Sequence, residues 1–464
     1  MIAFAFLGGP ARAQADNNLV YQVFVRSFAT SEGPVGDLRG IRRQFSYIRD
    51  LNAGVLWLMP IFPTTTYHGY DIADYRSVNP EYGDLADLDA LIKEAHGSGV
   101  RVILDIAFNH TSTAHPWFKQ AVEDPSSPYR KFYFITNDDG TPLPALWHRI
   151  KNVRYLGEFS RTMPELNLDN RALRQEIKSI AKFWLDRGID GFRLDAANHI
   201  YDSDAQRTNR WWAEFSRFVY SINPRALLIG EVLGDAATAR RYAPGLKRLL
   251  NDSFMRSIRA QIVTPKAGFL KQWAEFSAGF DPFVFVASHD ANPRLASFLD
   301  QKNKPASYPL AMYLLLLIAK NPVLYNGDEI MQRGIKWDGQ ADGSHIYDET
   351  LREPFPWFAS VVKPPQTTWF TPRYDSPNDG VSVEEQKQKG GMLLLVRALA
   401  RFRKENPDFA NADIVEIVED SGRRLVFRKG KYSVVIDGTE CRVTNSDGAV
   451  VFRDVAGARA GNRF

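Results

Sequence analysis

The sequence predicts an α/β protein built on a (β/α)8 barrel, with a domain inserted after the third strand and a short all-β domain at the C-terminus. Three observations lead to this fold: short apolar runs alternate with amphipathic helical stretches, one gap is too long for a simple crossover, and the C-terminal residues alternate apolar and polar side chains. We expect the barrel to occupy residues 16–109 and 166–407, the insertion 110–165, and the β domain 408–464.

Short apolar runs supply eight candidate strands, and the sixth is the weakest pattern. They are residues 20–25, 55–58, 100–106, 191–194, 227–232, 252–254, 283–287 and 322–325. Residues 85–97 and 173–188 keep apolar side chains at helical spacing, and a glycine ends each run. This alternation implies parallel strands joined by helical crossovers. An open doubly wound sheet is the alternative, but no glycine fingerprint for a dinucleotide follows any strand.

The remaining segments predict the insertion and the C-terminal domain. Residues 110–165 are rich in Pro, Ser, Asp and aromatic side chains, and a loop of that length is usually functional or a small domain. Residues 327–381 form a second long excursion, and a last helix is predicted over 384–405. Beyond it, residues 414–454 alternate apolar and polar side chains. Hairpin turns are expected at Ser421-Gly422, Asp437-Gly438 and Asp447-Gly448.

Composition excludes several classes of protein. The formal charge is +4 over 464 residues, without a basic block, so we expect no nucleic-acid partner. Cys441 is the single cysteine, so an intrachain disulfide is impossible. The longest apolar run, Ala311 to Ala319, is too short to span a bilayer, so we expect no membrane partner and interpret the run as a buried helix. We expect a monomer.

The N-terminus has features of a secretory signal. An apolar run, Met1 to Leu7, precedes small residues, and Ala13-Gln14-Ala15 fits an A-x-A cleavage site. We therefore expect residues 1–15 to be a signal peptide and the protein to be secreted or periplasmic. The alternatives are a start inside a longer signal and a buried N-terminal strand, because the apolar run is short and no basic residue precedes it.

Polar side chains gather where the predicted strands end. The third strand is followed by Asn109 and His110, the fifth by Glu231, and the seventh by His289 and Asp290. The fourth strand and the turn after it contain Arg193, Asp195, Asn198 and His199. Because catalytic residues of such barrels lie at the carboxyl ends of the strands, we expect three carboxylates to meet at one mouth.

Three converging carboxylates suit glycoside hydrolysis. One carboxylate attacks the anomeric carbon, and a second, with a raised pKa, protonates the leaving oxygen. Arg193 and Asp195 are two residues apart on a strand, so they point the same way. We expect the fixed charge of Arg193 to orient Asp195 and keep it ionised.

Several motifs in order resemble the α-amylase superfamily, glycoside hydrolase family thirteen, from about Leu19 to Pro407. They are YQVFVRSF, HGYD, DIAFNH, MPELN, GFRLDAANH, GEV, SHD and REPFPW (Arg352 to Trp357). The resemblance implies that Asp195 is the nucleophile, Glu231 the acid/base and Asp290 the transition-state stabiliser. It also implies sugar contacts for the following residues: Arg193, His110 and His289 hold the sugar being cleaved, Tyr70 stacks on it, and Asn198 lies at a leaving-side position where amylases often carry Lys.

The resemblance further implies a calcium site. Its ligands would be Asn109, the carboxylate of Glu165 and the backbone carbonyl of His199, since oxygen ligands suit Ca²⁺. The family usually has Asp where this chain has Glu165, and the longer side chain could shift the site or leave it empty.

Residues near the mouth favour one member of the family. Exo-acting α-glucosidases usually carry Asp two positions before the Gly-Tyr pair, where this chain has Tyr67. This favours an open, endo-acting cleft and an α-amylase of the group intermediate between amylases and oligo-1,6-glucosidases, with starch-like α-glucans and maltooligosaccharides as substrates. The alternatives are an α-glucosidase, a cyclomaltodextrin or pullulan hydrolase, and a glucanotransferase. An inactive carbohydrate-binding homologue is a more distant alternative.

Overall fold

The computed structural model describes residues 17–201, 204–341, 344–438 and 440–455. The predicted signal peptide, residues 1–15, lies outside the described residues. Among the described residues, no helix combines the length and apolar character needed to cross a bilayer.

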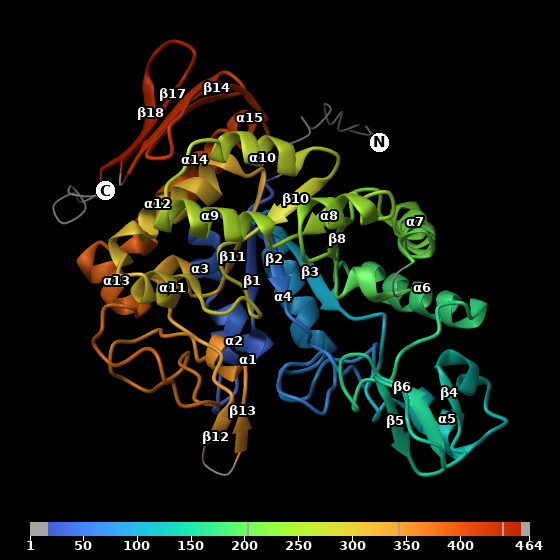
Figure 1. Cartoon of the computed structure of the whole chain (residues 1–464). Helices are drawn as coiled ribbons and strands as arrows, with labels where there is room; N and C mark the ends of the chain where they lie inside the picture. The colour runs from blue at the N-terminus through green and yellow to red at the C-terminus, as the bar shows by residue number, and fades with distance from the viewer. Residues whose placement is uncertain (1–16, 202–203, 342–343, 439, 456–464) are drawn as a thin grey trace, which may run out of the picture.

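Eight parallel strands close into a barrel, which confirms the predicted fold class (Figure 1). In chain order they are β1 (Val20–Val23), β2 (Val55–Leu58), β3 (Arg101–Ile106), β7 (Gly191–Leu194), β8 (Leu227–Glu231), β9 (Arg248–Leu250), β10 (Asp281–Val284) and β11 (Asn321–Tyr325). Each strand pairs with its neighbours in chain order, and β11 pairs with β1 to close the ring. All strand carboxyl ends therefore open at one face.

Helices surround this barrel and bury their apolar faces against it. The principal ones are α4 (Leu85–Gly97), α6 (Arg171–Asp186), α7 (Ala205–Ile222), α9 (Ser253–Val263), α10 (Phe269–Ser277), α12 (Tyr308–Tyr313) and α14 (Met392–Glu405). In α4, Asp84 and Asp87 form a reciprocal capping box that fixes the start of the helix. The apolar run at 311–319 lies inside, as predicted: α12 passes into a π-helical turn, Leu314–Ile318, whose side chains are all buried.

Two predicted elements differ in the structure. The sixth strand was expected at residues 252–254, but β9 ends at Leu250, and Ser253 already begins α9. A three-residue strand is too short to show the alternation on which the prediction depended. The predicted helix over 384–405 is two helices, α13 (Val383–Lys389) and α14, because Gly390 adopts a left-handed φ of 70° that ends the first.

The insertion and the C-terminal region each contain their own sheet. Between β3 and α6 lie α5 (Pro116–Glu123) and a three-stranded sheet of β4 (Ile135–Asn137), β5 (Trp147–Ile150) and β6 (Val153–Leu156). The C-terminal sheet has the order β14 (Ile414–Asp420), β15 (Arg424–Lys429), β16 (Tyr432–Asp437), β17 (Glu440–Thr444) and β18 (Val450–Val455). Figure 1 shows these two sheets at opposite ends of the molecule, teal and red.

Candidate active site

A buried arginine holds three carboxylates together at the mouth of the barrel. Arg193 lies on β7, and its side chain is fully buried. Its Nη1 donates to Asp105 Oδ1 at 2.7 Å and to Asp195 Oδ1 at 2.5 Å, and its Nη2 pairs with Glu231 at the end of β8. The two-residue spacing along β7 points Arg193 and Asp195 the same way. Asp105 from β3 and Glu231 from β8 reach the same guanidinium, so carboxylates from three strands meet there.

A second arginine positions the remaining predicted carboxylate. Arg352 donates from Nη2 to Asp290 Oδ1 at 2.8 Å and to Asp348 at 2.9 Å. Its Nε donates to the backbone carbonyl of His289 at 3.1 Å. Tyr67 joins this group, because its hydroxyl donates to Asp348 and its ring stacks on Trp369 at 5.7 Å. Arg352, Asp348 and Tyr67 therefore form a connected hydrogen-bonded group that lines the mouth beside Asp290.

The predicted sugar-holding rings line the same mouth. The ring of Tyr70 stacks on His289 with centroids 5.7 Å apart, and its hydroxyl lies 2.6 Å from His289 Nε2 and 3.0 Å from Asp105. His110 Nε2 lies 3.1 Å from the carbonyl of Tyr70, whereas its buried Nδ1 has no hydrogen-bond partner among the described residues. Gln22 fixes the other nitrogen of His289 at 2.7 Å.

The electrostatic environment separates the predicted acid from the stabiliser. Burial raises the pKa of Glu231 above its usual value; Arg193 opposes this rise, and Asp195 and Asp290 add to it. Burial would also raise the pKa of Asp290, but His289, Arg352 and Arg193 hold it well below its usual range. Because burial keeps His289 neutral by lowering its own pKa, we assign the low pKa of Asp290 mainly to the permanent charge of Arg352.

The pKa of Asp195 depends on its burial as well as on the charge of Arg193, which was expected to keep Asp195 ionised. Burial is the largest influence and raises the pKa of Asp195, while Arg193 opposes the rise. The positive charge of Arg193 is shared with Asp105, for which burial raises the pKa to about 7. Arg193 orients Asp195, as predicted, but it does not lower the pKa of Asp195 below the usual value.

Two predicted residues lie beside this cluster and not within it. Asn198 and His199 belong to the 3-10 turn Ala197–His199 after β7, and the imidazole Nδ1 of His199 pairs with Glu158 of the insertion at 2.8 Å. The Asn198 side chain is half-buried and makes no hydrogen bond with another described residue. The turn still contacts the site, because the amide N–H of Ala196 donates to Glu231 at 3.1 Å.

Two of the residues predicted to bind calcium, Asn109 and Glu165, lie where the insertion joins the barrel. Asn109 is 1% exposed, and neither polar atom of its side chain has a hydrogen-bond partner among the described residues. The backbone N–H of Leu166 donates to the Asn109 carbonyl at 2.7 Å, which brings the buried Glu165 alongside. Across the described ranges, no group of three or more His, Cys, Asp or Glu side chains could hold a metal. An orphaned amide beside one carboxylate nevertheless fits an oxygen-ligated cation completed by backbone carbonyls.

Sequence reasoning missed the residues that support the site. Asp348 was not singled out, although it bridges Tyr67 and Arg352. Trp57 donates its indole N–H to Asp105 at 3.1 Å, and Arg352 had appeared only as part of a motif. The period-two alternation on β2 could have placed Trp57 toward the barrel interior, but nothing local marks Asp348.

This arrangement, with carboxylates from several strand ends around a buried arginine at a barrel mouth, is that of a glycoside hydrolase. The family model described as "Alpha amylase, catalytic domain" matches residues 22–412, so the chain belongs to the α-amylase superfamily, glycoside hydrolase family thirteen. It is 36% identical to "Alpha-amylase 3" of Dictyoglomus thermophilum, over 89% of this chain and 82% of that protein.

Two further comparisons show the breadth of the family. The chain is 31% identical to the 4-alpha-glucanotransferase of Thermotoga neapolitana, over 94% of this chain and 97% of that protein. The crystal structure of the α-amylase from H. orenii superimposes with a TM-score of 0.80 at 30% identity, covering 92% of this chain and 89% of that one. These relatives include both hydrolases and transferases.

Proposed function

We propose that this protein is a retaining, endo-acting hydrolase of α-1,4-glucosidic bonds in starch-like glucans and maltooligosaccharides. The observation that carries the proposal is the contact of one guanidinium, that of Arg193, with both Asp195 and Glu231. Carboxylates that share one guanidinium are close together, and a retaining glycosidase needs a close pair, because its nucleophile must reach the anomeric carbon directly. The wider separation of an inverting pair leaves room for a water.

The proposed reaction has two steps. Asp195 attacks the anomeric carbon while Glu231, whose pKa burial raises, gives a proton to the leaving oxygen. A covalent glycosyl-enzyme results, and the leaving chain departs. Glu231, now ionised, then takes a proton from the incoming water, which releases the sugar with its original anomeric configuration.

The surrounding residues have distinct roles in this proposal. Asp290, ionised by Arg352, stabilises positive charge at the sugar ring in the transition state. Tyr70 offers a ring face to the sugar, while His110 and His289, whose pKa values burial lowers, are neutral hydrogen-bonding groups at pH 7. For His110 the pKa falls to about 4, and its unpartnered Nδ1 is available to a sugar hydroxyl.

Endo action is supported by the Asp290 side of the mouth. Tyr67 occupies the position where an exo-acting enzyme would hold an acidic side chain, and its hydroxyl is already used by Asp348 and Arg352. The half-buried ring of Tyr67, stacked on Trp369, offers an aromatic surface along which a glucan chain can extend beyond the cleaved bond. The similarity to the Dictyoglomus α-amylase supports the same activity.

We also propose a structural Ca²⁺ held by the Asn109 amide oxygen, the Glu165 carboxylate and the His199 carbonyl. The ion would tie the insertion to the barrel and would supply rigidity, without a part in the chemistry. A chelator should then lower the Tm and added Ca²⁺ should restore it, while Asn109→Leu should not respond to either. An identical Tm with chelator and with Ca²⁺ in the parent protein would rule the site out.

A glucanotransferase activity is the second candidate, because the similarity to the Thermotoga 4-alpha-glucanotransferase extends over almost the whole length of both proteins. In that reaction a sugar hydroxyl replaces water as the second attacking group. Asn198, half-buried beside the site, is the position at which leaving-side contacts could shift this balance.

Timed product analysis separates these activities. With soluble starch, an endo-hydrolase gives mixed maltooligosaccharides early with a fast loss of iodine colour, and it cleaves p-nitrophenyl α-glucoside slowly. Glucose alone with fast cleavage of the small glycoside would mean an exo-glucosidase. Maltotriose converted to longer chains with little new reducing sugar would mean a transferase, and no conversion of any substrate would mean a binding protein.

A further inference from the structure

Asp348 is a carboxylate at the mouth to which the two-step reaction gives no role. It directly precedes the 3-10 turn Glu349–Leu351, a position where an aspartate usually accepts a hydrogen bond from the N–H groups of the turn. Across the described ranges, its side chain makes no such capping bond. Instead its Oδ1 accepts from the Tyr67 hydroxyl, and its Oδ2 accepts from Arg352 Nη2 at 2.9 Å. The carboxylate is therefore directed toward the mouth and not toward its own turn.

One nitrogen of Arg352 joins Asp348 to Asp290. Nη2 donates to Asp290 Oδ1 at 2.8 Å as well as to Asp348. The Arg352 side chain is 3% exposed, so water screens little of its charge, whereas the Asp290 side chain is 42% exposed at the mouth. His289 Nε2 lies 2.9 Å from the other oxygen of Asp290, and burial lowers the pKa of His289 and keeps it neutral. Arg352 is therefore the permanent positive charge that contacts Asp290.

The charge of Arg352 has two opposite effects on the proposed reaction. It keeps Asp290 ionised, but a bare cation beside the reacting sugar would repel the positive charge that develops there in the transition state. A second carboxylate on the same nitrogen changes this balance. Arg352 still donates to Asp290 at short range, whereas at the greater distance of the sugar ring Arg352 and Asp348 act as a dipole. The field of a dipole falls off faster with distance than that of a single charge.

The Tyr67 hydroxyl fixes the second oxygen of Asp348. The same hydroxyl accepts from Arg352 Nη1 at 3.2 Å, and the guanidinium lies over the Tyr67 ring at 5.4 Å. The ring in turn stacks on Trp369. Burial raises the pKa of Asp348, Arg352 opposes the rise, and Glu349 adds to it. Asp348 in turn favours the charged form of Arg352, so the two side chains form an ion pair with fixed geometry.

We propose that Asp348 is a positioning residue that neutralises Arg352 at the distance of the sugar, so that Asp290 meets the transition state with its full negative charge. The proposal rests on the function proposed above, because it concerns the same bond-breaking step. In this role Asp348 acts through Arg352 and Tyr67 and does not itself contact the reacting atoms. Its loss should weaken the binding of positively charged sugars and of the transition state, and should affect neutral sugars little.

A matched pair of ligands separates charge from shape. Glucose and deoxynojirimycin have nearly the same shape, but the second has a ring nitrogen that is protonated in mildly acidic buffer. The dissociation constants of both ligands are measured by NMR titration in the parent, Asp348→Asn and Asp348→Glu. Asp348→Asn keeps the size of the side chain and should weaken the binding of the cationic ligand about tenfold relative to glucose. Asp348→Glu keeps the charge and should retain most of the preference for the cation.

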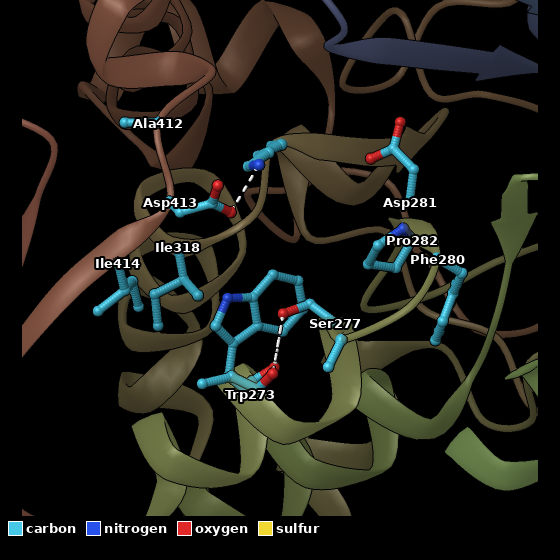
Figure 2. A pocket seen from close by; sticks show the side chains of 12 residues that line it. Trp273, Ser277, Phe280, Asp281, Pro282, Ile318, Ala412, Asp413 and Ile414 are labelled. Atoms are coloured by element: carbon cyan, nitrogen blue, oxygen red, sulfur yellow. Dashed lines mark hydrogen bonds and ion pairs between the residues drawn. The ribbon is translucent and has the colours of Figure 1, made fainter.

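Asp413→Asn is the matched control, because it also removes one carboxylate from an ion pair. Asp413 lies directly before β14 and pairs with Lys320 at 2.5 Å, far from the strand ends that carry the site (Figure 2). This variant should bind both ligands as the parent does. Asp348→Asn should in addition lower kcat on maltoheptaose at least about tenfold with little change in KM, because the lost stabilisation belongs to the transition state.

Three results would overturn the proposal. Equal affinities of Asp348→Asn and the parent, or an equal weakening of both ligands, would mean that Asp348 only shapes the mouth. Loss of the preference in Asp348→Glu would mean that the charge is not what matters. A parent that does not prefer the cationic ligand would show that the mouth is not negative. A parent that does not cleave maltoheptaose would instead refute the proposed function, and the ratio of the two dissociation constants would still decide the role of Asp348.

Discussion

Two regions of the molecule bury arginine completely and compensate its charge in opposite ways. At the mouth, burial would lower the pKa of Arg193, but the surrounding Asp105, Asp195 and Glu231 hold it well above the usual value. At the junction with the C-terminal sheet, Arg403 of α14 donates to the backbone carbonyls of Leu316, Ala319 and Lys320, its only hydrogen-bond partners in the described part of the chain. Burial lowers the pKa of Arg403 to about 9.

The junction contains a second buried basic side chain with the same kind of partner. Lys429 of β15 is fully buried and donates to the carbonyls of Leu317 and Ile318 at 3.2 and 3.1 Å. Together, the Arg403 and Lys429 side chains donate to five successive carbonyls at the end of the π-helical turn. The last carbonyls of a helix have no partner within the helix, and the negative end of the helix dipole lies there, so basic side chains stabilise this end. Buried basic side chains therefore organise reacting carboxylates in one region and join two parts of the fold in the other.

The largest expected effect is at the mouth. Asp195→Asn removes the proposed nucleophile and should lower kcat on maltoheptaose by at least about 10⁴-fold while the far-UV spectrum and Tm stay near those of the parent. Asp413→Asn changes a junction carboxylate that pairs with Lys320, and it should leave kcat unchanged. A parental rate in Asp195→Asn would end the assignment of the nucleophile.

The junction should respond in stability and not in activity. Arg403→Met leaves three buried carbonyls without their donor, so the free energy of unfolding should fall by about 3 kcal/mol. Urea unfolding measures this loss, and kcat per folded molecule should remain parental, because Arg403 is remote from the strand ends. A loss of activity in the folded variant would contradict the separation of the two regions.

Arg352→Met tests the other arginine of the mouth. We expect kcat to fall about 10²-fold, because Asp290 and Asp348 lose the group that positions them. Arg352 depresses the pKa of Asp290, so its removal should raise that pKa and move the acidic limb of the kcat profile to higher pH. An unshifted acidic limb at pH 4–7 would show that Arg352 has only a packing role.

The contrast also explains what the sequence could predict. The barrel, the insertion and the residues Arg193, Asp195, Glu231 and His289 follow from strand periodicity, ordered motifs and the rule that strand ends meet. Asp348 could not be placed, because it contacts Tyr67 across 281 residues of chain, and no local pattern carries such a contact. The roles of Arg403 and Lys429 were likewise hidden: their partners are backbone carbonyls, which every residue possesses, so no sequence pattern distinguishes them.

The smallest expected effect concerns pH. Lys429→Met should cost about 1 kcal/mol at pH 7, because two carbonyls lose a donor. Burial, reinforced by Arg403 and Lys320, holds the pKa of Lys429 well below its usual value, although Asp413 opposes this. Above that folded-state pKa and below about 10.4, the unfolded chain binds more protons at this residue, so the stability of the parent rises with pH.

The methionine variant lacks this rise, and the difference in unfolding free energy between the two proteins should grow from pH 7 to pH 10. If the unfolding free energies of the two proteins changed in parallel with pH, Lys429 would keep its proton throughout this range. The carbonyls at the helix end would then stabilise its buried charge as fully as the carboxylates stabilise that of Arg193.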